Sequence, residues 1–146
     1  HAMLQVMEES LSNVAADNRV LHYLDAVNTK MPEVMTRTLY ADADAALNSF
    51  LTLNSKFEFC GVAGADGIAI AHHLSGEKKP SKSVGVSFTD RAYYQRGMKG
   101  QKTIVGVVSK TTGKIATIMG LPIMRDGKPE GSGEEESVLS VPARTE

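Results

Sequence analysis

The sequence predicts an α+β domain in which two helices precede a mainly antiparallel sheet. Before Lys56, apolar residues recur every three to four positions, which is the spacing of helices that bury one side. After Lys56, short apolar runs separated by glycine-containing turns are typical of strands and hairpins. Helices followed by hairpins favour an α+β architecture, and 146 residues suffice for one domain over residues 1–146.

Composition narrows the possible functions. The chain is 42% hydrophobic and 23% charged, as folded domains are, and its net charge of -1 gives no basic surface for nucleic acid. The single cysteine, Cys60, excludes an internal disulfide and a Cys-rich zinc site. No apolar run approaches the roughly 18 residues of a membrane span. The start His1-Ala2-Met3 resembles the remnant of an expression tag, so we expect a domain excised from a longer protein.

Residues 1–29 are predicted to form one long helix. Its apolar residues share one stripe: Leu4, Met7, Leu11, Val14, Leu21 and Leu24. Because the stripe is close to a heptad repeat, two alternatives stay open. The helix packs only on its own domain, or it also forms a homodimer with the same helix of a second copy.

A second helix is predicted over residues 31–54. Pro32 fits the first turn of a helix and Glu33 complements its N-terminal dipole, while Asn54 and Ser55 mark its end. Helical spacing gives this segment one apolar face, formed by Met35, Leu39, Ala43, Leu47 and Phe50.

Residues 56–146 are predicted to form the sheet region. A hairpin turns at Asp66-Gly67, because this dipeptide readily adopts positive φ angles. Residues 76–83 are polar and interrupted by proline, which indicates a surface loop. A short helix is expected within residues 89–100, with a capping Thr or Asp at its start and a glycine at its end.

Two further strands are predicted at residues 103–109 and 115–123, and the second is nearly continuous in apolar residues, as central strands are. After the turn at Asp126-Gly127, residues 131–136 read Gly-Ser-Gly-Glu-Glu-Glu, which we interpret as a flexible acidic linker. A last strand is expected at residues 137–141.

No catalytic constellation is visible. The sequence has no phosphate-binding loop, no dinucleotide glycine fingerprint, no His-Glu-x-x-His pair and no nucleophile elbow. It therefore predicts neither an enzyme nor a bound cofactor. His72 and His73 are adjacent in a predicted strand and point to opposite faces, so they do not jointly hold a metal ion.

One segment, Arg91-Ala92-Tyr93-Tyr94, combines side chains that are suited to binding a small acid. Arginine offers a planar fork that matches a carboxylate, and tyrosine adds a hydroxyl group and a flat apolar wall. At the start of a short helix these residues would form a pocket for a small acid. The alternative is that Arg91 pairs with Asp90 at the surface while both tyrosines belong to the core.

The order of several motifs resembles a known family. Residues 88–94 read Phe-Thr-Asp-Arg-Ala-Tyr-Tyr, residues 100–106 read Gly-Gln-Lys-Thr-Ile-Val-Gly, residues 109–114 read Ser-Lys-Thr-Thr-Gly-Lys, and Leu121-Pro122-Ile123 precedes Asp126-Gly127. In this order and spacing they are similar to the Cache (PDC-type, PAS-like) sensor domains of bacterial chemoreceptors and sensor histidine kinases. The similarity covers about residues 57–128.

The resemblance implies a PAS-like central antiparallel sheet and a long N-terminal helix that continues from a transmembrane segment. It implies a periplasmic or other extracytoplasmic domain of an inner-membrane receptor, which binds small organic acids, amino acids or amines. By the same resemblance, Arg91 holds a ligand carboxylate, and Tyr93 and Tyr94 wall the pocket or donate hydrogen bonds.

One departure from that family narrows the ligand. Amino-acid-binding members carry a Tyr-x-Asp run where this chain has Val-Val-Ser at residues 107–109. The acid that would neutralise a ligand ammonium is missing, and an unpaired buried ammonium is costly, so a simple carboxylate is the expected ligand. Alternation along the strands and the need for a second cation give further candidate contacts: Ser109, Thr111, Thr117 and Lys102.

The sequence thus predicts a ligand-binding sensor domain for chemotaxis or signal transduction, which binds a small organic carboxylate and has no catalytic activity. One alternative is a cytoplasmic PAS-like module that binds a cofactor such as haem or flavin. A small enzyme is the third class, and it would need a catalytic pair that the spacing does not reveal.

Overall fold

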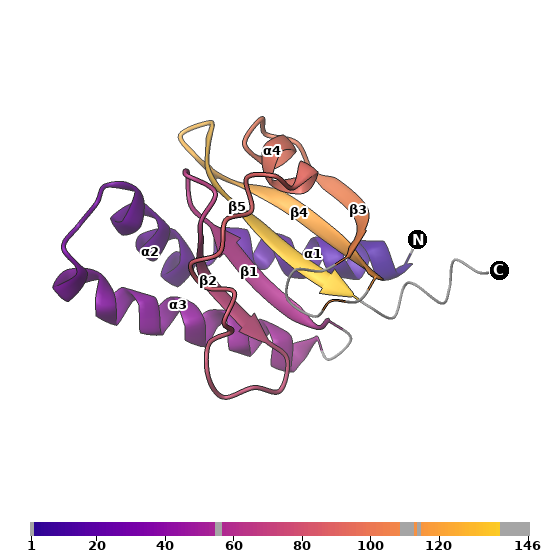
Figure 1. Ribbon diagram of the computed structural model, residues 1–146, viewed down its shortest axis with the longest axis horizontal. Coiled ribbons are helices and arrows are strands. Elements are labelled where there is room, and N and C mark those ends of the chain that lie inside the picture. The colour runs from indigo at the N-terminus through magenta and orange to yellow at the C-terminus, as the bar shows by residue number, and fades with distance from the viewer. Residues whose placement is uncertain (1, 55–56, 109–112, 114, 138–146) are drawn as a thin grey trace.

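The structure is a computed structural model that describes residues 2–54, 57–108, 113 and 115–137. Figure 1 shows the helices and strands in these ranges: α1 (Ala2–Ala16), α2 (Asn18–Asn28), α3 (Glu33–Leu53), β1 (Phe59–Ala63), β2 (Ala69–Leu74), α4 (Ala92–Gly97), β3 (Thr103–Val108), β4 (Ile115–Arg125) and β5 (Lys128–Ser137). Helices followed by antiparallel strands confirm the predicted α+β class. Within the described ranges, no helix combines the length and the hydrophobicity that crossing a membrane requires.

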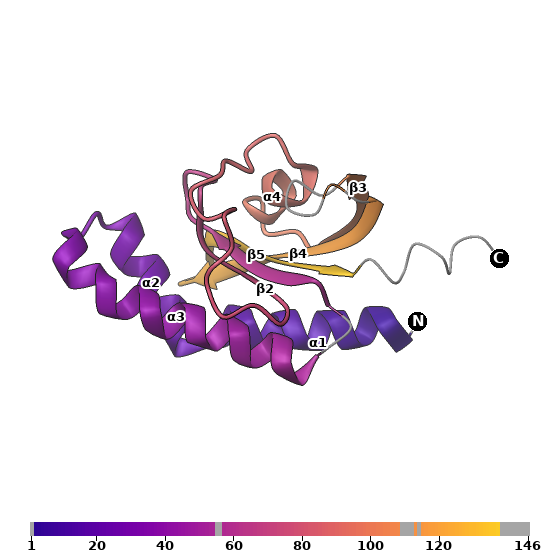
Figure 2. The ribbon, with the colours of Figure 1, turned by 60° about the horizontal axis from the view of Figure 1, so that its bottom comes forward.

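The strands form one antiparallel sheet in the order β2-β1-β5-β4-β3. Figure 2 shows that α1 and α3 run along one face of this sheet, whereas α4 and the chain around it lie over the other. We call these the helical face and the α4 face. Because side chains of a strand point alternately to the two sides, each strand contributes every second residue to each face.

Two helices replace the single helix expected over residues 1–29. The break falls at Asp17, whose backbone is extended and whose side chain accepts a hydrogen bond of 2.8 Å from the Arg19 backbone N–H. This is the N-cap geometry that starts a new helix, and it satisfies an amide that would otherwise lack a partner. The next helix, α3, spans Glu33–Leu53 and begins directly after Pro32.

The region predicted as a flexible acidic linker is the central strand β5, so that prediction is wrong. β5 pairs with β1 on one side and with β4 on the other. Its glycines fit a crowded position: a methyl group added at Gly131 would lie 2.5 Å from the Ala63 carbonyl oxygen and 3.0 Å from Leu24. Glycine here permits close contact between α2 and the sheet. The strand expected at residues 137–141 lies outside the described residues, apart from Ser137 at the end of β5.

The predicted hairpins are confirmed. β1 and β2 pair across the turn at Asp66-Gly67, where Gly67 has a φ of 83° that only glycine adopts without strain. β3 and β4 pair in the same antiparallel way. The short helix also forms, as α4.

Both faces of the sheet are buried under apolar side chains. On the helical face, α1, α2 and α3 contribute Leu11, Leu24 and Leu47 to a core that includes Met119 and Ile123 of β4. On the α4 face the core is mainly aromatic, with Phe59, Phe88, Tyr93, Tyr94 and Ile118. Each fully buried side chain of this size stabilises the fold by about 1.5–3 kcal/mol.

Candidate functional site

The segment predicted to bind a ligand lies on the α4 face. Arg91 is the N-cap of α4, and the helix follows over Ala92–Gly97. Tyr93 is 1% exposed and packs over Gly120 of β4, where an added methyl group would be 3.0 Å from the Tyr93 Cβ. The glycine therefore allows α4 to lie close to the sheet, with Tyr93 lining the interior between them.

Arg91 lies at the border of this interior. Its side chain is partly exposed, and its Nη2 donates a hydrogen bond of 3.0 Å to the carbonyl oxygen of Val108, the last residue of the edge strand β3. A guanidinium has five N–H donors. The bond to Val108 fixes the side chain, and it leaves donors for a carboxylate that arrives from solvent.

Tyr94 has a structural role that its sequence pattern does not reveal. Its hydroxyl lies 3.0 Å from the Gly64 carbonyl oxygen and 2.9 Å from that of Ala65, so its one proton is shared between two backbone acceptors. Burial, with a smaller contribution from Asp66, raises the pKa of this phenol. The hydroxyl fastens α4 to the turn between β1 and β2, and it is not available to donate to a ligand in this arrangement.

The structure does not gather the other predicted contacts around Arg91. Ser109 and Thr111 lie outside the described residues. The Lys102 ammonium donates a hydrogen bond of 2.8 Å to the Glu8 carboxylate of α1, and both side chains are exposed. Lys102 is thus engaged with α1, on the side of the sheet away from α4.

Thr117 lies on the opposite face from the tyrosines, so the structure does not bring it together with them. On β4, Ile118 and Gly120 belong to the α4 face, since they pack with or beneath Tyr93. Alternation then places Thr117 on the helical face, together with Met119.

A row of buried residues crosses the α4 face at the centre of the sheet. Cross-strand register aligns, from β2 to β3, His72, Gly61, Glu134, Gly120 and Thr103. Ser132 lies on the same face, two residues before Glu134. The side-chain oxygens of Thr103, Ser132 and Glu134 are fully buried and have no hydrogen-bond partner among the residues that the structure describes.

The environment of Glu134 favours the uncharged carboxyl. Glu134 is 0% exposed, and burial raises its pKa to about 8 from 4.5. No charged group of the described residues contributes to this shift. The nearby His72 is also buried, and burial, then the neighbouring His73, lowers its pKa to about 3. At neutral pH the row therefore holds a neutral imidazole and a largely protonated carboxyl.

The linker interpretation of residues 131–136 does not predict this row. The detectable signal was alternation: Gly131 and Gly133 pack against α2 and α1, while Ser132 and Glu134 point to the other face. Gly-rich sequences are poor strands by propensity, but pairing on both sides overrides propensity in the middle of a sheet.

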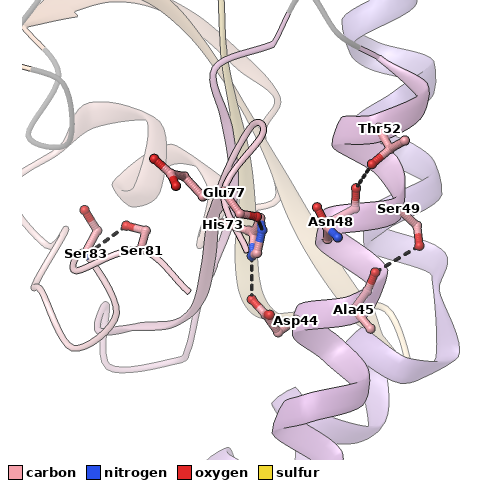
Figure 3. A network of polar contacts seen from close by, with 9 residues as sticks. All are labelled: Asp44, Ala45, Asn48, Ser49, Thr52, His73, Glu77, Ser81 and Ser83. Carbon is pink, nitrogen blue, oxygen red and sulfur yellow. Dashed lines mark hydrogen bonds and ion pairs between the residues drawn. The ribbon is translucent and has the colours of Figure 1, made fainter. Parts of the chain in front are cut away.

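The second buried histidine belongs to a separate network on the helical face (Figure 3). The His73 Nδ1 lies 3.0 Å from an Asp44 carboxylate oxygen of α3, and its Nε2 lies 2.7 Å from the Glu77 carbonyl oxygen. An ionised carboxylate and a carbonyl both only accept, so both nitrogens make hydrogen bonds when the ring carries two protons. This network joins β2 to α3 and plays no part in the α4 face.

A groove of about 600 Å³ opens on the other side of the molecule, between α1 and the chain around β3 and β4. Its lining includes Glu8, Leu21, Lys102, Leu121 and Met124. Neither Arg91 nor Glu134 borders it, so it is not continuous with the α4 face.

The architecture is PAS-like, with helices on one face of a five-stranded antiparallel sheet and a short helix over the other. No protein-family model and no curated protein matches the chain. Among solved structures, it is similar to the sensor domain of the V. cholerae histidine kinase DctB, with a TM-score of 0.79 and 16% identity over 95% of this chain and 50% of that one.

Two chemoreceptor domains are also similar. The ligand-binding domain of Campylobacter jejuni Tlp3, in complex with L-valine, gives a TM-score of 0.62 at 12% identity over 95% of this chain and 61% of that one. That of Pseudomonas fluorescens CtaA, in complex with L-leucine, gives 0.60 at 15% identity, over 99% and 52%. The chain thus spans about half to three fifths of the length of these relatives. The likeness confirms the Cache-like fold that the sequence motifs predicted.

Proposed function

We propose that this chain is the extracytoplasmic ligand-binding domain of a bacterial transmembrane receptor, and that it binds a small organic carboxylate at Arg91. The observation that carries the proposal is the fold: 95–99% of the chain superimposes on sensor and ligand-binding domains of a histidine kinase and of chemoreceptors. Two of these domains hold a small molecule that bears a carboxylate, L-valine or L-leucine.

Arg91 is the best-placed anchor for a carboxylate among the described residues of the α4 face. Its guanidinium donates a hydrogen bond to the Val108 carbonyl. The Arg91 side chain is partly exposed, so an acid reaches it from solvent without unfolding of α4. Tyr93 closes the interior behind it. A bidentate pair between arginine and a carboxylate is among the strongest hydrogen-bonded contacts in proteins.

Signalling would follow from a shift between two positions of α4. A ligand bound at Arg91 favours the position of α4 in which its affinity is higher. α1 and α2 pack on the opposite face of the same sheet, so they are the elements that would carry such a shift towards a membrane anchor, either within one chain or in a homodimer through the first helix.

The test is a thermal-shift screen with acetate, pyruvate, lactate and succinate, followed by titration of the best acid. Arg91→Ala is expected to weaken that acid by about 30-fold or more, because losing a charge-assisted contact costs roughly 2–5 kcal/mol. Arg96→Ala is the matched control, since Arg96 lies on the same helix and is exposed. Equal affinity of the parent and Arg91→Ala for every acid that binds would refute the assignment.

A further inference from the structure

A buried histidine on the helical face joins three segments of the chain. His73 of β2 is 1% exposed. Its Nδ1 lies 3.0 Å from an Asp44 carboxylate oxygen of α3, and its Nε2 lies 2.7 Å from the Glu77 carbonyl oxygen (Figure 3). Residues 75–80 are exposed, and the chain returns to the sheet at Ser81, whose N–H donates a hydrogen bond of 3.0 Å to a carbonyl of β2. The His73 ring therefore fastens the middle of this loop to the interior of the domain.

The number of hydrogen bonds that the His73 ring makes depends on its protonation. An ionised carboxylate, such as that of Asp44, and the Glu77 carbonyl only accept hydrogen bonds. A doubly protonated imidazole donates to both of them, whereas a neutral imidazole has one N–H and one lone pair. After the loss of one proton, one ring nitrogen therefore faces an acceptor oxygen with no proton between them, and that contact is repulsive.

The Glu77 carbonyl is the partner that a neutral ring loses. A hydrogen bond to an ionised carboxylate is roughly twice as strong as one between neutral groups. The remaining proton therefore stays on Nδ1, towards Asp44, and Nε2 turns its lone pair towards Glu77. β2 and α3 stay joined, while the loop over residues 75–81 loses its attachment to the ring.

The groups around His73 leave its own proton as the variable one. The titratable groups packed around this network come from α3, β1, β2 and the loop: Asp44, Tyr40, Cys60, His72 and Glu77. Burial, then Asp44 and Tyr23, raises the pKa of Tyr40 to about 12. Burial, then His73, lowers the pKa of His72 to about 3. Histidine side chains ordinarily change charge between about pH 5 and pH 8, and Tyr40 and His72 stay neutral in that range.

We propose that His73 is a proton-dependent switch, which holds the loop over residues 75–81 against the sheet when its ring carries two protons and releases the loop when it carries one. In this step the Nε2–H bond breaks, its electron pair stays on the nitrogen and the proton goes to solvent. No other covalent bond changes. The switch lies on the helical face and Arg91 lies at the α4 face, so this input is separate from the acid site.

The first measurement is an NMR titration of the His73 ring nitrogens, in protein labelled with nitrogen-15, from pH 5 to pH 9. Two hydrogen-bonded N–H groups are expected at the acidic end. At the basic end, Nδ1 is expected to keep its proton and Nε2 to show the chemical shift of an unprotonated nitrogen. The midpoint of this change is the pH at which the loop is expected to be released.

Release of the loop is measured by tryptic cleavage between Lys78 and Lys79, which lie in its exposed part. The rate at each pH is divided by the rate for a free peptide with residues 74–83, which removes the pH dependence of the protease. This ratio is expected to rise about tenfold between pH 6 and pH 9, because a hydrogen bond that holds the loop is lost. Its midpoint is expected to match that of the NMR titration.

Three variants test the assignment to His73. His73→Gln has no charge to lose, so its cleavage ratio is expected to stay constant from pH 6 to pH 9. Asp44→Asn removes the negative charge beside the ring, so both midpoints are expected to move together to lower pH. His22→Gln, which changes an exposed histidine of α2, is the matched control and is expected to alter neither midpoint.

Three results would each overturn the proposal: a ring whose protonation does not change between pH 5 and pH 9, a cleavage ratio that does not change with pH, or a pH-dependent ratio that persists in His73→Gln. If His73→Gln does not fold, Asp44→Asn decides, because unchanged midpoints in that variant contradict the switch. None of these outcomes bears on the acid site, which Arg91→Ala tests separately.

Discussion

Replacing Glu134 by glutamine is expected to stabilise the empty domain, and to do so more strongly as the pH rises. Glutamine has nearly the same shape and remains neutral at every pH. The parent carboxyl must hold a proton to stay buried, because no described group compensates its charge. The substitution therefore removes the free-energy cost of keeping Glu134 protonated, which increases with pH.

The magnitude follows from the pKa of Glu134 in the two states. The folded value of about 8 lies above the unfolded value of 4.5, so the folded state binds this proton more tightly. The stabilising contribution of the group is fully present below pH 4.5 and is lost as the pH rises towards 8. Each pH unit is worth about 1.36 kcal/mol, so by pH 7 the parent has lost about 3 kcal/mol that Glu134→Gln does not lose.

Urea denaturation of both proteins at several values between pH 4 and pH 8 measures this difference. At pH 4 the free energies of unfolding are expected to differ little, and by pH 7 the variant is expected to be about 3 kcal/mol more stable, which corresponds to roughly 6–12 °C in Tm. Glu77→Gln supplies the control for loss of an exposed carboxylate. A constant difference over the whole range would refute the argument, because it would mean that Glu134 is not protonated by burial.

Two further predictions concern packing. Gly131→Ala is expected to destabilise the domain by more than about 2 kcal/mol in urea denaturation, because its methyl group would overlap a β1 carbonyl oxygen and press on Leu24. The control is Gly106→Ala, which is expected to cost little because no atom lies nearer than 4.0 Å to the added methyl group. Equal losses of stability in the two variants would mean that β5 does not occupy the centre of the sheet. Tyr94→Phe is expected to lower the free energy of unfolding by about 1–2 kcal/mol and to leave the affinity for acids unchanged, because the Tyr94 hydroxyl donates to two backbone carbonyls. Unchanged stability with a tenfold loss of affinity would instead place that hydroxyl in the ligand site.

Much of the fold could be predicted because local pattern and tertiary environment agree. The Asp66-Gly67 turn needs a positive φ, and Pro32 followed by Glu33 suits the start of α3, so the sequence and the structure coincide there. The break at Asp17 was missed because apolar periodicity continues across it. An aspartate followed by Asn18 is a capping signal, which hydrophobic spacing alone does not detect.

β5 could not be predicted from its own composition. Gly131 and Gly133 lower strand propensity, and the reason for their presence lies in Leu24 and Leu11, which are more than a hundred residues away along the chain. The burial of Glu134 is equally non-local, because it depends on α4 and on both neighbouring strands. A run of glutamates normally indicates a solvated segment. The alternation of Gly131 and Gly133 with Ser132 and Glu134 indicates a strand with two different faces, but it does not indicate that Glu134 is fully enclosed.

The candidate site was predicted in part. Arg91, Tyr93 and Tyr94 were singled out, and the structure brings all three to the α4 face. Their contacts could not be read from the sequence, since the Tyr94 hydroxyl is used by a turn some thirty residues earlier in the chain. Thr117 was chosen because it lies on the strand that pairs with β3, and the sequence does not show which face of that strand α4 covers.

The most direct test of ligand binding on the α4 face is a crystal structure of the domain with the acid that raises its Tm most. We expect electron density for this acid at the α4 face, with its carboxylate at Arg91. Density only in the groove between α1 and β4, against Lys102, would contradict it.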